Sequence, residues 1–122
     1  APEAAVAALD AFGGEVKTYI GGGTDRGFDF APLAQALVLR AIPNVILLPP
    51  GGPSILAALA ALDPGAAARA RVVTDLAEAV ALAALLTPQG STVLFSPASP
   101  SYGVYKNFEE RGNVFRDFVQ AL

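Results

Sequence analysis

The stretch that decides the fold runs from residue 16 to residue 53 and reads VKTYIGGGTDRGFDFAPLAQALVLRAIPNVILLPPGGP. It begins with a short β-branched and aromatic run at 16–20, which the glycines at 21–23 end, so it predicts a strand. A second apolar run, 44–48, is continuous and is closed by Pro and Gly residues, which is typical of a strand buried on both faces. Between them, residues 32–39 begin with a proline and predict a helix. Strand, helix and strand in this order predict a parallel pair joined by a right-handed crossover.

The segments on either side continue the alternation. Helices are expected at 2–12, 54–62, 74–85 and in the amphipathic segment 108–122, and strands at 71–73 and 92–95. Thr74 is expected to cap the helix at 74–85, Asp63-Pro64-Gly65 to end the helix before it, and residues 96–107 to form a polar loop. The sequence therefore predicts one domain, residues 1–122, with a small doubly wound, Rossmann-like α/β fold. Its mostly parallel sheet has helices on both faces and the strand order 3-2-1-4.

The composition limits the chemistry that the chain can perform. Its 122 residues include no Cys, His, Met or Trp. Zinc sites built on Cys or His, Ser-His-Asp and Cys-His catalysis, haem ligation and disulfides are therefore excluded within this chain. The net charge of -3 and the scattered Lys and Arg predict no nucleic-acid partner and no membrane partner. Because the chain begins with Ala1, it is expected to be processed or to be a piece of a longer polypeptide.

The predicted strand order reverses between the strands at 16–20 and 92–95. Ligands of such sheets bind beyond the carboxyl ends of the strands at this reversal. The loops that leave these ends are 21–29 and 96–107, and both are rich in Gly, Ser and charged side chains. Topology and composition therefore predict the same binding site, formed by the two loops.

The first loop, Gly21 to Gly27, offers glycine amides and two opposite charges. Arg26 could bind a phosphate or carboxylate through two hydrogen bonds, and Asp25 could orient it or bind a ribose hydroxyl. The alternative is a plain glycine-rich turn, in which the two charges pair with each other at the surface. The loop lacks the further features of a dinucleotide motif, and the chain has no Walker A sequence.

The second loop leads into a helix whose expected N-cap is Asn107. The free amide of Phe108, the Lys106 ammonium and the Ser101 hydroxyl could together hold a carboxylate, because the start of a helix favours anions. The alternative is that the Ser and Asn side chains only satisfy backbone groups of the loop.

These residues carry a resemblance to the C-terminal domain of the Mur ligases, in particular to the branch that adds D-glutamate to UDP-N-acetylmuramoyl-L-alanine. The resemblance rests on Gly22 to Gly27 with Asp29-Phe30, on Phe95 to Ser99, and above all on Lys106-Asn107-Phe108-Glu109-Glu110-Arg111-Gly112-Asn113-Val114-Phe115. It covers nearly the whole chain, because Pro2-Glu3-Ala4-Ala5 resembles the helix that follows the family's Asn-Asp-Ser-Lys-Ala-Thr-Asn motif. That motif would lie just upstream of Ala1.

The resemblance implies a division of labour among domains. In this family an N-terminal domain holds the UDP-sugar, a central domain carries the P-loop for ATP and Mg²⁺, and the C-terminal domain delivers the amino acid. The chain is thus expected to be part of a cytoplasmic, ATP-dependent, amide-forming ligase of peptidoglycan synthesis, without its N-terminal and central domains. Alone it is expected to be inactive, with no catalytic residue, no metal ligand and no bound cofactor.

The resemblance also implies roles for residues of both loops. Those implied to bind D-glutamate are Ser101, Tyr102, Lys106 and Phe108, with Ser101 and the Phe108 amide on its side-chain carboxylate. Those implied to reach the nucleotide are Thr24, Asp25 and Arg26.

The chain departs from the family pattern at three places. Arg26 stands where Lys is usual, Tyr102 stands where a smaller aliphatic residue is common, and residues 48–54 lack the basic residue that often binds the α-carboxylate. Two alternatives stay open. One is a stand-alone Rossmann-like module that binds a nucleotide or anion without catalysis, and the other is a ligase that uses another acidic or basic amino acid.

Overall fold

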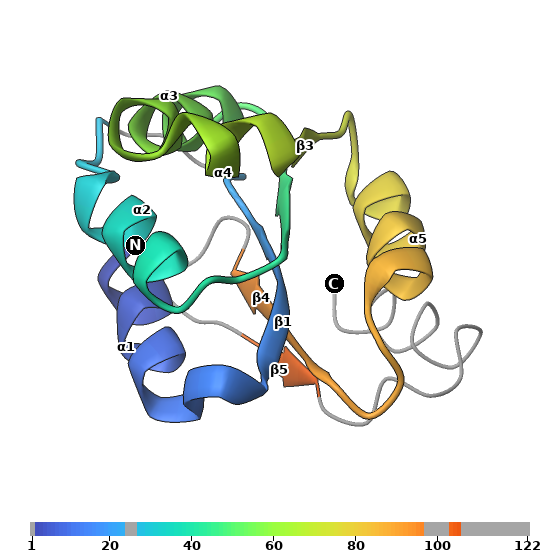
Figure 1. Cartoon of the computed structure of the whole chain (residues 1–122). Coiled ribbons are helices and arrows are strands. Elements are labelled where there is room, and N and C mark those ends of the chain that lie inside the picture. The colour runs from blue at the N-terminus through green and yellow to red at the C-terminus, as the bar shows by residue number, and fades with distance from the viewer. Residues whose placement is uncertain (1, 24–26, 97–102, 106–122) are drawn as a thin grey trace.

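Helices and strands alternate along the chain in the computed structural model, which describes residues 2–23, 27–96 and 103–105 (Figure 1). The helices are α1 (Pro2–Phe12), α2 (Ala31–Leu39), α3 (Gly52–Leu62), α4 (Pro64–Arg69) and α5 (Leu76–Leu86), with a 3-10 turn η1 (Gly13–Glu15) after α1. The strands are β1 (Val16–Gly21), β2 (Asn44–Leu47), β3 (Arg71–Val72), β4 (Thr92–Ser96) and β5 (Gly103–Tyr105).

The strands form one sheet with the order β3-β2-β1-β4-β5. The pairs β1·β2, β1·β4 and β2·β3 are parallel, so the predicted order 3-2-1-4 is confirmed. The edge strand β5 pairs antiparallel with β4, with Gly103 opposite Phe95. The parallel strands need crossovers, and α1 to α4 lie on one side of the sheet while α5 lies on the other (Figure 1). The predicted doubly wound α/β fold is therefore confirmed.

Each face of the sheet has its own apolar core, because successive side chains of a strand point to opposite faces. In β1, Tyr19 belongs to the core beneath α1, α2 and α3, while Ile20 belongs to the core beneath α5. The pairing repeats this alternation in β4, where Leu94 lies opposite Tyr19 and Phe95 opposite Ile20. All four of these side chains are buried, which explains the continuous apolar runs in the sequence.

A buried polar cluster ties the end of α5 to the amino-terminal part of the sheet. The hydroxyls of Thr18 in β1 and Thr87 after α5 are 2.6 Å apart and share a hydrogen bond. Asn44 at the start of β2 donates from Nδ2 to Thr18 Oγ1 and to the Leu86 carbonyl, both at 3.3 Å. The pairing of β1 with β4 shifts register between Val16 and Thr18. In the described ranges no buried side-chain polar atom lacks a partner.

The turn expected at Asp63-Pro64-Gly65 ends one helix and begins another. It does end α3, but Asp63 is also the N-cap of α4, a helix that the sequence pattern did not predict. Asp63 Oδ1 accepts hydrogen bonds from the amides of Gly65 and Ala66 at 3.0 and 3.2 Å. Pro64 then occupies the first helical position, where a missing N–H is harmless. Asp63, Pro64 and Gly65, which were expected only to end a helix, therefore also form the start of α4.

The expected capping by Thr74 is wrong. The N-cap of α5 is Asp75, whose Oδ1 accepts from the Glu78 amide at 2.8 Å. Thr74 lies one residue earlier and donates its amide and hydroxyl to Glu78 Oε2 at 3.0 and 2.7 Å. α1, α3 and α5 have 11 residues each, and no helix in the described ranges is long and apolar enough to cross a membrane.

The expected polar loop at 96–107 is wrong at its centre, where residues 103–105 form β5. The run Gly-Val-Tyr is too short to be recognised as a strand in the sequence, and its pairing with β4 decides its conformation. The helix expected at 108–122 lies outside the described residues.

Candidate functional site

The carboxyl ends of three parallel strands lie side by side. Gly21 at the end of β1 is paired with Leu47 of β2 on one side and with Ser96 of β4 on the other. The segments that follow Gly21 and Ser96 thus leave the sheet from neighbouring positions. The prediction that both loops start at one edge is confirmed by this register, and the reversal of strand order lies at the same place.

The Tyr19 phenol lies directly beneath the start of the first loop. A Cβ added to Gly21 would collide with the Tyr19 hydroxyl and ring, so only glycine fits above this side chain. Tyr19 is 1% exposed, and burial raises the pKa of its phenol well above the usual range. The edge of the sheet therefore has a neutral, protonated hydroxyl group under Gly21.

The second glycine of the loop packs against the loop that follows β2. Gly22 has φ +103°, and a Cβ at this position would lie 2.8 Å from both the Leu48 carbonyl oxygen and the Gly52 nitrogen. The Leu48 amide donates to the Gly21 carbonyl at 2.8 Å, which extends the pairing of β1 and β2 by one bond. Backbone thus touches backbone here, and a side chain on Gly22 would force the two loops apart.

The start of α3 lies at this edge, but its first amides are already engaged. The Gly52 amide donates to the Leu48 carbonyl at 2.7 Å, and the amides of Ser54 and Ile55 donate to the Gly51 carbonyl at 3.1 Å. Pro53 has no N–H to offer. The amides of Gly52, Ser54 and Ile55 are therefore engaged within the chain, and residues 48–54 have no basic side chain.

The far end of the first loop is fixed at the start of α2. Asp29 Oδ1 accepts from the Ala31 amide at 3.0 Å, while Phe30 precedes the helix and is 6% exposed. The rings of Phe28 and Phe30 meet edge to face, with their centroids 6.2 Å apart. Both ends of the segment that contains Asp25 and Arg26 are thus anchored, by Gly22 on one side and by Asp29 and Phe30 on the other.

The residues predicted to bind ligands lie outside the described ranges. These residues are Thr24, Asp25, Arg26, Ser101, Tyr102, Lys106 and Phe108. Their described neighbours in the sequence are Gly23 and Gly27 for the first loop, and Ser96, Gly103 and Tyr105 for the second. The roles of the seven residues stay predictions.

The described residues do not form a metal site. In residues 2–23, 27–96 and 103–105, no three Asp, Glu, His or Cys side chains gather closely enough to hold a metal ion. We therefore assign no Mg²⁺ ligand to this part of the chain. Sequence reasoning placed Gly22 in the first loop but did not single out Tyr19 as part of the edge, because a tyrosine in a strand is common where no ligand binds.

The chain is similar to ligases that act on UDP-N-acetylmuramoyl-alanine. It is 48% identical over 119 residues to a Salinispora tropica ligase named for UDP-N-acetylmuramoyl-L-alanine and L-glutamate, covering 98% of this chain and 26% of that protein. It is 43% identical over 121 residues to a Symbiobacterium thermophilum ligase named for UDP-N-acetylmuramoylalanine and D-glutamate, and this match covers 99% of this chain and 26% of that protein. For a second ligase named for D-glutamate, from Geotalea uraniireducens, the identity is 38% over 117 residues, and the match covers 96% of this chain and 24% of that protein.

The chain thus spans about a quarter of the length of the curated relatives it matches. No family model and no solved structure matches it.

Proposed function

Because this chain is homologous to one segment of the UDP-N-acetylmuramoyl-alanine glutamate ligases, we propose that it is the amino-acid-delivering C-terminal domain of such an enzyme. The observation that carries the proposal is identity of 48% and 43% over nearly the whole chain to relatives with this printed activity. The whole enzyme is a cytoplasmic, ATP-dependent ligase that forms an amide bond in peptidoglycan precursor synthesis.

ATP and Mg²⁺, which the rest of the enzyme would hold, would transfer the γ-phosphoryl group to the UDP-N-acetylmuramoyl-alanine carboxylate, giving an acyl phosphate and ADP. The glutamate amine attacks the acyl carbon, the amine loses a proton and phosphate leaves, which forms the amide bond. The task of this chain is to hold glutamate so that its amine faces that carbon, which lowers the entropic part of the barrier. The glutamate amine is itself the nucleophile, so the domain need not supply one.

The second loop binds the glutamate side chain in this proposal. Ser101 and the Phe108 amide hold the side-chain carboxylate, with Tyr102 and Lys106 beside them. The pairing of Gly103 with Phe95 supports this placement, because it returns the chain to the carboxyl end of β4 directly after Tyr102.

The first loop serves the nucleotide. Thr24, Asp25 and Arg26 reach the ATP phosphates or ribose, and Arg26 can contact a phosphate through two donors. The packing of Gly22 on Gly52 and the Asx bond of Asp29 to Ala31 support this role, because they hold both ends of the segment in place.

The enantiomer of glutamate has two candidates, each with its own support. The motif at residues 106–115 resembles the branch that adds D-glutamate. The relatives from Salinispora tropica and a Micromonospora strain, both 48% identical, are named for L-glutamate. Product formation by the full-length enzyme with each enantiomer separately decides between them, and activity with neither but with another amino acid would overturn both.

The test of the site uses the full-length enzyme with steady-state kinetics. Ser101→Ala is expected to raise the KM for glutamate at least about tenfold with little change in the KM for ATP, because a hydrogen bond to a charged group is lost. Arg26→Gln is expected to do the reverse. Ser91→Ala, in the turn before β4, is the matched control. Unchanged glutamate kinetics in Ser101→Ala would remove this residue from the site.

A second measurement separates the proposal from a stand-alone binding module. Calorimetry on the 122-residue chain is expected to show only weak ATP binding, since the P-loop belongs to another domain. Tight nucleotide binding by this chain, or ligase activity without other domains, would contradict the division of labour.

A further inference from the structure

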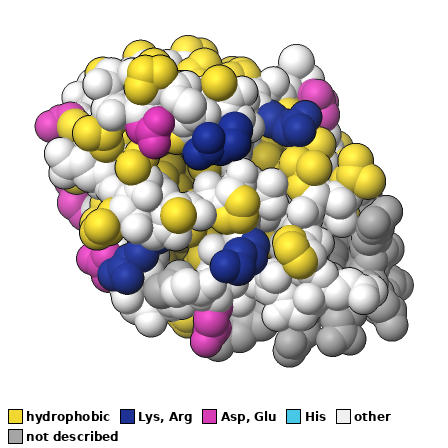
Figure 2. Space-filling model, in the orientation of Figure 1, with side chains coloured by type: hydrophobic (Ala, Val, Ile, Leu, Met, Phe, Trp, Pro, Cys, Tyr) yellow, Lys and Arg dark blue, Asp and Glu magenta, His cyan; other side chains and the backbone are white. Residues whose placement is uncertain are grey.

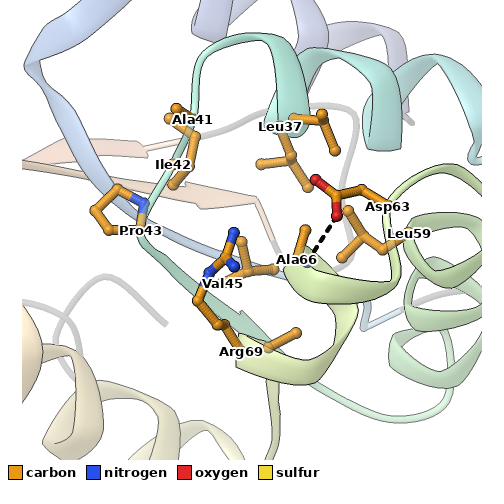
Figure 3. Close-up of a pocket in the computed structure, with 11 residues that line it drawn as sticks. Leu37, Ala41, Ile42, Pro43, Val45, Leu59, Asp63, Ala66 and Arg69 are labelled. Carbon is orange, nitrogen blue, oxygen red and sulfur yellow. Dashed lines mark hydrogen bonds between the residues drawn. The ribbon is translucent and has the colours of Figure 1, made fainter.

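A pocket lies at the amino-terminal edge of the sheet, at the opposite ends of the strands from the two ligand loops (Figure 3). It has a volume of about 130 Å³ and is lined by the end of α2, the start of β2, the end of α3 and residues of α4. Its apolar wall includes Leu37, Ile42, Val45 and Leu59. These side chains belong to the core beneath α1, α2 and α3 and are nearly fully buried, so the wall is rigid.

Asp63 places a negative charge at the rim of this pocket. It is half-buried at the junction of α3 and α4, and both amides that it caps, those of Gly65 and Ala66, donate to the same oxygen, Oδ1. Figure 3 shows the other carboxylate oxygen turned toward the space between α2 and α4. The capping role fixes the side chain, so its outward oxygen is held in position for a donor.

Arg69 places a positive charge on the same rim. Its Nη1 lies 3.5 Å from the position that a Cβ on Gly65 would take, and Asp63 Oδ1 lies 3.3 Å from that same position. The two charged groups are therefore neighbours, yet the only ion pair within the described ranges joins Arg40 and Asp10, at 3.3 Å. Asp63 and Arg69 thus lie on one rim without neutralising each other in a direct contact.

The surroundings add positive charge without adding another carboxylate to the pocket. Arg71 follows in β3, two residues after Arg69, and Lys and Arg side chains are visible on the face that carries α4 and β3 (Figure 2). Asp63 is the only carboxylate among the residues that line the pocket. A ligand carboxylate thus has one defined partner on this rim, Arg69, and a ligand cation has one, Asp63.

We propose that this pocket binds a free α-amino acid with a branched aliphatic side chain. Its carboxylate pairs with the Arg69 guanidinium, its ammonium group donates to the free oxygen of Asp63, and its side chain fills the space against Leu37, Ile42 and Leu59. A ligand with a carboxylate but no ammonium group would leave Asp63 facing an apolar group. A ligand with an ammonium group but no carboxylate would leave Arg69 facing an apolar group. A zwitterionic amino acid satisfies both Asp63 and Arg69. It can lie between these two neighbouring charged groups, which do not contact each other, and form a hydrogen bond of about 2.9 Å to each of them.

The binding site is independent of the proposed ligase function, since none of its residues lies on the two ligand loops. The test is a titration of the ¹⁵N-labelled 122-residue chain with L-leucine, followed by NMR amide shifts. Saturable shifts are expected at Val38, Ile42 and Ala70, with a dissociation constant on the order of millimolar. Glycine, 4-methylpentanoate and 3-methylbutylamine, which lack the side chain, the amine and the carboxylate respectively, are expected to bind at least about tenfold more weakly.

Matched variants assign the charges. Arg69→Gln and Asp63→Asn are each expected to weaken L-leucine binding at least about tenfold, and asparagine keeps the capping role of Asp63. Their controls are Arg71→Gln, on the same face but outside the pocket, and Asp75→Asn, an N-cap on α5. Both controls are expected to bind L-leucine within about twofold of the parent chain.

A variant that fills the pocket keeps the proposal testable if a charge variant disturbs α4. Ala66→Leu adds bulk at a lining position with a good helix former and is expected to abolish the shifts. The proposal is overturned if L-leucine gives no saturable shifts at the pocket, or if 4-methylpentanoate binds as tightly. Equal losses in Arg69→Gln and Arg71→Gln, or undiminished binding to Ala66→Leu, would also overturn it.

Discussion

Gly22→Ala is the change that most directly probes how the carboxyl edge of the sheet is built. Gly22 combines a positive φ of +103° with a contact to backbone on the neighbouring loop. A new Cβ would lie 2.8 Å from the Leu48 carbonyl oxygen and from the Gly52 nitrogen, closer than real Cβ atoms approach such groups. Neither partner is the end of a flexible side chain, so relief requires that one loop moves.

The size of the effect follows from two separate contributions. The left-handed backbone costs an L-residue roughly 1–2 kcal/mol, and forced overpacking costs typically about 1–3 kcal/mol. The lower entropy of the unfolded alanine chain returns about 0.4–1 kcal/mol. We therefore expect Gly22→Ala to lower the free energy of unfolding by about 2–4 kcal/mol, a large share of the roughly 5–15 kcal/mol of an ordinary domain.

Urea unfolding measures this loss, and two other glycines separate the contributions. Gly90 also has a positive φ, +79°, but a Cβ there would meet nothing within 4 Å, so Gly90→Ala tests the backbone contribution alone. Gly14 has neither a positive φ nor a neighbour within 4 Å, so Gly14→Ala is the neutral control. With a slope of about 1–3 kcal/mol per molar urea, Gly22→Ala is expected to lower the urea midpoint by about 0.7–4 M.

The order of the three variants is the decisive result. If Gly22→Ala is no less stable than Gly90→Ala, then the packing of Gly22 on Gly52 does not hold the loop, and the account of the carboxyl edge is wrong. If Gly14→Ala is as unstable as the other two, then the loss has another cause than φ or close contact.

Three further predictions concern buried and titrating groups. Thr18→Val is expected to lower the free energy of unfolding by about 1–3 kcal/mol, because the buried Thr87 hydroxyl loses its partner. Urea unfolding of both single variants and the double variant tests this. The double variant Thr18→Val/Thr87→Val should lose less free energy of unfolding than the sum of the two single losses. Hydrogen bonds from the Thr74 amide and, second, from its hydroxyl lower the pKa of Glu78. The stability that this carboxylate contributes is therefore present above pH 4.5 and is lost as the pH falls further. On acidification, the urea midpoint of Glu78→Gln should fall less than that of the parent chain. Burial raises the pKa of Tyr19, so the stability that its neutral phenol contributes is complete below pH 10.0 and is lost as the pH rises beyond it. Unfolding measured against pH should show that Tyr19→Phe loses less stability in alkali than the parent chain. An equal loss of stability in both proteins would contradict a buried neutral phenol.

The parallel part of the fold could be predicted because its signals are local and strong. The run at 44–48 is apolar at nearly every position, and β2 is indeed buried on both faces. α4 was missed because Asp63-Pro64-Gly65 has the composition of a turn, while its helical role depends on Asp63 adopting an extended backbone with φ -150°. Thr74 and Asp75 are adjacent and both are good caps, and only the backbone of Asp75 decides between them.

The common edge from which the two loops leave the sheet could also be predicted, but the pocket at the other edge could not. The two loops follow strands whose order is constrained by fold rules, so their common edge follows from the order of helices and strands along the chain. The pocket joins two stretches of the chain, residues 37–45 and 59–70, and no motif in the sequence indicates that they enclose a cavity. In the sequence, Asp63 looks like a turn residue and Arg69 like a surface charge, and only the α3–α4 junction brings them together.

α3 connects the two edges of the sheet, and this explains why its first residue is a glycine. Its first residue, Gly52, is squeezed between β2 and the first loop: a Cβ there would lie 3.1 Å from the Leu47 Cβ, and the Gly52 nitrogen already limits Gly22. Toward its other end, Leu59 lines the pocket, and Asp63 follows directly after the helix. Since α3 has almost no freedom to shift at Gly52, the rim of the pocket and the first loop are positioned by the same helix. Gly52, which looks like a simple turn residue in the sequence, is therefore a packing residue that sets the geometry at both edges.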